Sequence, residues 1–189
     1  MVLACYRELL PTQPRLRLVI VPRHPERFDE VAGLIRGNGF ELVRRSSAEL
    51  ATGDRASAVI LGDTMGELRK FYGLADVVFV GRSLVDLGPR QHGSDMIEPA
   101  ALAKPVIVGP FTHNFADAMA KLRGADAVRV VPEGAALRAA VLDILTDPAS
   151  AAEMGRRARE VVRREQGATA RHAEAILTAL TAAGTKETK

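Results

Sequence analysis

The sequence predicts an α/β domain in which helices cover both faces of a parallel sheet. Apolar runs rich in β-branched residues alternate along the chain with segments of helical periodicity. These runs are continuously apolar, which is typical of strands buried on both faces of a parallel sheet. Small or polar residues follow several of the runs directly. Because ligands bind beyond the carboxyl ends of parallel strands, the fold class also predicts where a site lies.

The elements follow one another with clear boundaries. Pro22 and Pro25 end the first predicted strand, and glycines at 37 and 39 stop the helix after it. Strands are expected at residues 16–21, 40–43, 58–61, 76–80, 105–108 and 127–131. Helices are expected at residues 26–36, 65–72, 97–103, 114–122, 135–145 and 149–183, the last with a break at Gly167. These elements give three parts: a helical or linker segment at 1–15, one ligand-binding domain at 16–183, and a flexible tail at 184–189.

Composition narrows the class of function. The chain has 189 residues, a net charge of +3 and no tryptophan, so it offers neither a strong basic surface nor a stacking surface for single-stranded nucleic acid. Cys5 is the single cysteine, which excludes an internal disulfide or a cysteine-based zinc site and favours a reducing cytoplasm. His92 and His113 lack metal-ligand spacing, so no metal is predicted. No apolar run is long enough to span a bilayer, and the first residues lack a signal-peptide pattern.

The run Gly62-Asp63-Thr64-Met65-Gly66-Glu67 follows a predicted strand. Thr64 with Glu67 three residues later fits a capping box at the start of a helix. Free amides at such a helix start would suit a phosphate, whereas simple capping explains the same pattern equally well. The later run Gly81-Arg82-Ser83 also follows a strand directly and could let the backbone approach a ligand.

Charged residues at two further strand ends admit two interpretations. Glu98, beside Pro99, could be a helix-start acid or could accept hydrogen bonds from the two hydroxyls of a ribose. Arg23 and His24 lie between prolines after the first strand. They could pair with a phosphate or carboxylate, or project into water.

Taken together, these segments resemble the 3-deoxy-D-manno-octulosonic acid (Kdo) transferases of lipopolysaccharide assembly. The matching stretches are IVPRHPERF at 20–28, LGDTMGELRKFYGLADVVFVGRSL at 61–84 and IEPAALAKPVIVGPFTHNF at 97–115. The stretch around Met154 is also similar, so the resemblance runs from residue 16 to the last helix. It implies a Rossmann-like domain that forms the C-terminal, donor-binding half of a B-type glycosyltransferase.

The resemblance further implies a donor, an acceptor and a missing domain. The donor would be CMP-Kdo and the acceptor a lipid A precursor, with no metal or other cofactor. The catalytic base and the acceptor site would lie in an N-terminal Rossmann-like domain, in the same protein or in trans. The protein would work in the cytoplasm and reach the inner membrane through that domain. The implied donor-binding residues are Arg23, His24, Gly62, Asp63, Thr64, Met65, Gly66, Glu67, Gly81, Arg82, Ser83, Ser94, Asp95 and Glu98.

One segment departs from the family pattern. The family has a short Gly-Gly-His-Asn-Pro-Leu run before Glu-Pro, whereas this chain has the longer path from Leu87 to Ile97. Gly93-Ser94-Asp95 replaces the Gly-His-Asn positions, so the contacts that would select the sugar differ from the family's.

Three alternatives stay open on the sequence. The chain could belong to another nucleotide-sugar enzyme, such as a UDP-sugar transferase or a non-hydrolysing epimerase. It could be a non-catalytic α/β binding module. A dinucleotide-dependent oxidoreductase ranks last, because Pro22-Arg23-His24-Pro25 stands where Gly-x-Gly-x-x-Gly would follow the first strand.

Overall fold

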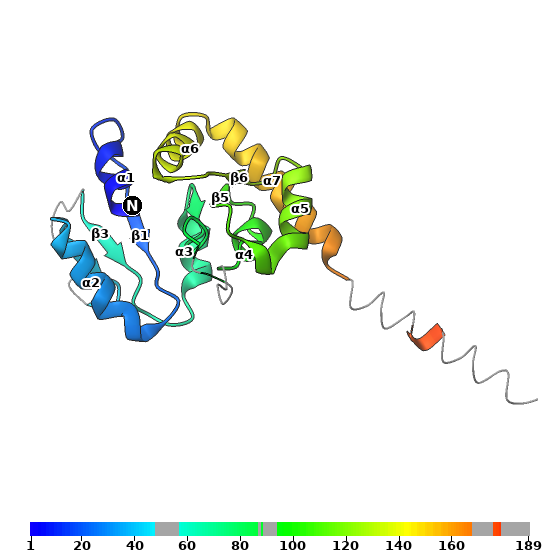
Figure 1. Ribbon diagram of the computed structural model, residues 1–189, viewed down its shortest axis with the longest axis horizontal. Coiled ribbons are helices and arrows are strands. Elements are labelled where there is room, and N and C mark those ends of the chain that lie inside the picture. The colour runs from blue at the N-terminus through cyan, green and yellow to red at the C-terminus, as the bar shows by residue number, and fades with distance from the viewer. Residues whose placement is uncertain (48–56, 87, 89–93, 168–175, 179–189) are drawn as a thin grey trace, which may run out of the picture.

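The computed structural model describes residues 1–47, 57–86, 88, 94–167 and 176–178, and it has the predicted parallel α/β architecture (Figure 1). The described strands form two three-stranded groups, each parallel throughout, where the sequence predicted one sheet. Pairing is limited to two or three residues a strand, so neither group extends far. The first group has the order β1 (Leu18–Ile20), β3 (Val59–Leu61), β2 (Leu42–Arg44), and the second the order β4 (Val78–Phe79), β5 (Val106–Val108), β6 (Arg129–Val130).

Helices and strands alternate along the chain from β1 onward, largely as the sequence predicted. The helix expected at 114–122 is a 3-10 turn followed by α5, and the last described long helix ends at Glu165, just before the break predicted at Gly167. The predicted tail at 184–189 lies outside the described residues. The helices are α1 (Val2–Leu9), η1 (Pro25–Arg27), α2 (Phe28–Gly37), α3 (Leu68–Leu74), α4 (Ile97–Ala101), η3 (His113–Phe115), α5 (Ala116–Gly124), α6 (Gly134–Thr146) and α7 (Pro148–Glu165).

Helix α1 is packed into the core and contacts both groups of strands. Cys5 and Leu9 lie in one hydrophobic cluster with Leu137 of α6 and Ile107 of β5. Tyr6, on another side of α1, packs with Val59 of β3 in a second cluster. Since one short helix supplies side chains to both clusters, α1 holds the two halves of the domain together.

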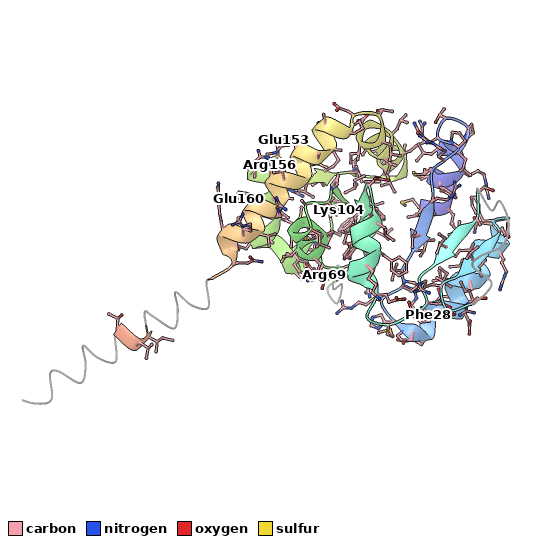
Figure 2. The ribbon with its side chains drawn as sticks, turned by 180° about the vertical axis from the view of Figure 1, so that it is seen from behind. Phe28, Arg69, Lys104, Glu153, Arg156 and Glu160 are labelled. Carbon is pink, nitrogen blue, oxygen red and sulfur yellow. The ribbon has the colours of Figure 1, made fainter. Side chains whose placement is uncertain are left out.

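Helix α7 lies against α4 and the turn that leads into β5 (Figure 1). A Cβ atom at Gly155 would lie 2.1 Å from the carbonyl oxygen of Ala103, so only glycine permits this approach. The start of α7 is capped by Asp147, whose carboxylate accepts a hydrogen bond from the Ser150 amide at 3.0 Å. On α7, Arg156 donates to Glu153 (Figure 2). Across the part of the chain that is described, no helix is both long and apolar enough to cross a membrane.

Candidate functional site at the carboxyl ends of the strands

The loop after β3 is held close to β1 by a glycine. The Gly62 amide donates to the carbonyl oxygen of Ile20 at 2.8 Å, which extends the pairing of β1 with β3 by one residue. A Cβ atom at Gly62 would lie 2.9 Å from Val21 and 3.0 Å from Phe71. Gly66, further along, has a φ of +76°, which a side chain would strain. The backbone of the Gly62–Glu67 loop is therefore constrained near both ends, by the contacts of Gly62 and by the positive φ of Gly66.

Asp63 anchors this loop to the end of β2. Its buried carboxylate accepts three hydrogen bonds: from the Ser46 amide at 2.8 Å, the Ser46 hydroxyl at 2.6 Å and Nε of Arg44 at 2.6 Å. Burial alone raises the pKa of Asp63, but the hydrogen bonds from Ser46 and Arg44 outweigh it, so the pKa is lowered. Asp63 is thus a charged group at neutral pH, and its charge is matched by Arg44.

The capping box predicted at Thr64 and Glu67 is wrong. The helix begins at Leu68 with Glu67 at the capping position, and neither residue caps a backbone amide through its side chain. The Thr64 hydroxyl instead donates to the Glu67 carboxylate at 2.5 Å. Glu67 also accepts from Arg45 at 3.2 Å and Lys70 at 3.1 Å, and the hydrogen bonds from Thr64 and Lys70 chiefly lower its pKa. The positive φ of Gly66 explains the shorter helix, because a right-handed helix cannot pass through that conformation.

The loop after β4 is joined to the loop after β5 through Ser83. The Ser83 hydroxyl donates to the Val80 carbonyl at 2.6 Å and accepts from the Gly109 amide at 2.8 Å, and the Ser83 carbonyl accepts from the Phe111 amide at 2.9 Å. Ser83 is 1% exposed. That Ser83 contacts a donor stays a prediction, and its buried hydroxyl favours a role in joining the two loops. Neighbouring Arg82 is exposed and adopts a φ of +59°, while Gly81 is partly exposed.

Helix α4 places an acid at this same edge. Asp95 accepts a hydrogen bond from the Ile97 amide at 2.7 Å and so fixes the start of the helix. Glu98 lies in the first turn and is exposed, as both interpretations of this residue require. Tyr72 of α3 lies close to both acids: burial, then the charges of Glu98 and Asp95, raise its pKa to about 12. Ser94 is partly exposed, whereas the preceding residues 89–93, part of the departure from the family pattern, lie outside the described residues.

The cationic turn after β1 is on the surface. Arg23 and His24 are both exposed, and Nδ1 of His24 lies 3.6 Å from the Glu26 carboxylate. Met65 is exposed at the tip of the β3 loop. These side chains are accessible from solvent, and contact of Arg23, His24 and Met65 with a donor stays a prediction.

Sequence reasoning missed the three residues at the end of β2, which are Arg44, Arg45 and Ser46. They contact Asp63 and Glu67 and so form one side of the predicted site. The signal was present, because they directly follow the strand predicted at 40–43, just as the other site residues follow their strands. No cluster of three or more metal-ligating acids, histidines or cysteines occurs among the described residues.

The fold and site define a parallel α/β domain whose polar loops gather where the strands end, and comparison with known proteins gives its family. No family model matches the chain. A 3-deoxy-D-manno-octulosonic acid transferase of Haemophilus influenzae is 41% identical over 171 residues, which is 90% of this chain and 39% of that protein. The transferase of the same name from Bordetella pertussis is 38% identical over 86% of this chain and 37% of that protein.

A solved structure points to the same family. The crystal structure of the C-terminal CMP-Kdo binding domain of WaaA from Acinetobacter baumannii matches with a TM-score of 0.75 and 31% identity, over 85% of this chain and 81% of that one. The chain therefore belongs to the Kdo transferase family of glycosyltransferases. This confirms the resemblance and the fold class predicted from the sequence. The chain spans less than two fifths of the length of the Haemophilus influenzae and Bordetella pertussis relatives: 39% and 37%.

Proposed function

We propose that this chain binds CMP-Kdo and supplies the donor site for transfer of Kdo to a lipid A precursor. The observation that carries the proposal is its likeness to the C-terminal CMP-Kdo binding domain, which extends over 85% of the chain. The donor residues predicted from the sequence lie in the loops after β1, β3 and β4 and at the start of α4.

The chemistry of the loops suits an anionic nucleotide sugar. CMP-Kdo carries a phosphate and a carboxylate, and Arg23 and His24 lie exposed where β1 ends. Charge-assisted hydrogen bonds from a guanidinium are the strong ones for such groups. Glu98, exposed in the first turn of α4, is the acid placed to accept hydrogen bonds from the ribose hydroxyls. Departure of CMP would then be aided by the positive charge of Arg23 near the leaving phosphate, and this chain would not have to supply a base for that step.

We further propose that the base for the acceptor hydroxyl comes from a second, N-terminal domain. Proton removal needs a group placed within hydrogen-bond reach of the acceptor. Asp63 and Glu67 already accept hydrogen bonds from neighbouring side chains, and Glu98 is assigned to the ribose. In this proposal the acceptor is a lipid A precursor, bound with that domain at the cytoplasmic face of the inner membrane.

The decisive experiment is a calorimetric titration of the chain with CMP, UMP and AMP. We expect CMP to bind with measurable affinity and UMP to bind more weakly. Glu98→Ala should weaken CMP binding by about 1.5–3 kcal/mol, the range for hydrogen bonds to a charged group. Glu160→Ala, which removes an acid on α7 that pairs with Arg164, is the matched control and should bind CMP like the parent.

Each other outcome favours a different function. A preference for UMP would favour a UDP-sugar enzyme. Failure to bind any nucleotide, together with tight binding of a protein partner, would favour a non-catalytic module. Transfer of Kdo from CMP-Kdo to a lipid A precursor by this chain alone would contradict the assignment of the base to another domain.

A further inference from the structure

We propose that Asp63 is a positioning residue whose carboxylate fixes the Gly62–Glu67 loop to the end of β2, and that this attachment sets the affinity of the loop for the nucleotide. The inference rests on the proposed function, because it assigns the loop a nucleotide to bind. It changes the role predicted for Asp63 from direct contact with the donor to support of the backbone that meets it.

The carboxylate of Asp63 is fully engaged within the protein. Oδ2 accepts from Arg44 Nε and from the Ser46 hydroxyl, both at 2.6 Å, and Oδ1 accepts from the Ser46 amide at 2.8 Å. The Asp63 side chain is 2% exposed. Because the side chain is this deeply buried, a ligand has little access to the carboxylate, so the geometry favours action through the loop.

Contacts on both sides of Asp63 restrict the backbone of the loop. On one side of Asp63, Gly62 bonds to Ile20 and fits tightly against Val21 and Phe71. On the other side, the Thr64 hydroxyl is held by the Glu67 carboxylate. Between these two attachments, Asp63 ties the loop to the end of β2. Freeing it would leave the loop tied to the end of β2 through the more exposed contact between Glu67 and Arg45.

The charge of Asp63 is essential to the attachment. Hydrogen bonds that involve an ionised partner are about twice as strong as neutral ones. Asparagine keeps the shape of the side chain but replaces one acceptor oxygen with an NH2 group, which cannot accept from Arg44 or Ser46. The lowered pKa of Asp63 keeps the carboxylate charged across the neutral range.

Asp29, the second acid that contacts Arg44, provides a matched control for Asp63. The Arg44 guanidinium contacts two acids, Asp63 through Nε at 2.6 Å and Asp29 of α2 through Nη1 at 2.8 Å. The Asp29 side chain is 89% exposed, whereas that of Asp63 is 2% exposed. Because exposed ion pairs contribute little, loss of Asp29 should leave the loop in place.

The test uses the 189-residue chain and the variants Asp63→Asn, Ser46→Ala, their double variant and Asp29→Asn. CMP affinity is measured by calorimetry, and hydrogen exchange of the amides at 64–67 is measured without ligand. We expect Asp63→Asn to weaken CMP binding by about tenfold or more. Ser46→Ala should weaken it several-fold, the double variant no further than Asp63→Asn, and Asp29→Asn by less than twofold.

Hydrogen exchange should rise at 64–67 in Asp63→Asn and Ser46→Ala, and stay unchanged in the buried strand β5. This pattern separates local positioning from general loss of stability. Should Asp63→Asn fail to fold, Ser46→Ala carries the test, since Ser46 is exposed and its change removes one bond to the carboxylate.

Three results would overturn the proposal. One is additive losses of CMP affinity in the double variant, which would mean that Asp63 and Ser46 act independently and that Asp63 touches the nucleotide itself. The second is a folded Asp63→Asn with parent affinity, and the third is parental exchange at 64–67. If the parent binds no CMP at all, the proposed function fails, and hydrogen exchange alone still decides whether Asp63 fixes the loop.

Discussion

The two groups of strands hold their terminal loops in different ways. At the ends of β2 and β3, charged side chains form the attachment: Asp63 bonds to Arg44 and Ser46, and Glu67 to Arg45. At the ends of β4 and β5, the attachment is neutral and buried, through the Ser83 hydroxyl and a glycine. A parallel α/β domain can thus hold some of its terminal loops through charged groups and others through neutral hydrogen bonds and close steric fit.

The steric half should give the largest effect when it is disturbed. A Cβ atom at Gly109 would lie 2.0 Å from the Ser83 carbonyl oxygen, a backbone atom that cannot move aside alone. We expect Gly109→Ala to lower the free energy of unfolding by about 3 kcal/mol or more. Urea denaturation followed by circular dichroism would measure it.

A second glycine provides the control for that substitution. Gly33 lies within α2 and a Cβ atom there would meet nothing within 4 Å. Gly33→Ala should raise the free energy of unfolding by about 0.5–1 kcal/mol, since alanine favours the helix. Equal effects of the two substitutions would show that the Ser83–Gly109 contact is not close.

The charged half should respond to acid. A carboxyl group whose pKa is lowered in the folded state stabilises the protein above its unfolded pKa of about 3.9, and this contribution is lost as the pH falls through the folded value. Asp63→Asn should therefore cost about 2–3 kcal/mol at pH 7. The difference from the parent should shrink as the pH falls below about 4. A constant difference across urea titrations at neutral and acid pH would contradict the charged attachment.

The neutral counterpart of Asp63 is Ser83, and it should show a smaller and pH-independent effect. Ser83→Ala leaves the buried amide of Gly109 without this acceptor, at a cost of about 1–2 kcal/mol. The same denaturation series at pH 7 and at acid pH would reveal any pH dependence. Ser57→Ala, at an exposed turn position, is the control and should stay within about 0.5 kcal/mol of the parent.

The smallest effect is expected at the exposed rim of the charged half. Arg45 contacts Glu67 at 3.2 Å with nearly half of its side chain exposed. Arg45→Ala should cost less than about 1 kcal/mol, and the cost should fall in 1 M salt, where charges at the surface are screened. A larger, salt-independent cost would mean that Arg45 contributes through packing of its side chain.

The sequence predicted the order of strands and helices because each apolar run is a local signal. It predicted the start of the helix after β3 wrongly, since Thr64 and Glu67 bond to each other across the turn at Gly66. It also missed the support from β2, because Ser46 and Asp63 are 17 residues apart and meet only through the pairing of two strands. Local patterns reveal which residues end a strand, whereas the partners of those residues depend on register.

The position of α1 has a consequence for how the domain is completed during synthesis. Leu9 is almost fully buried in a cluster that includes Leu137 and Ile144 of α6. These partners of Leu9 are synthesised more than a hundred residues after it. Contacts this distant in sequence close slowly and leave apolar surface exposed in the meantime. On the ribosome, the Tyr6 side of α1 should therefore find its partners in β3 first, and the Cys5 and Leu9 side should stay uncovered until α6 has emerged.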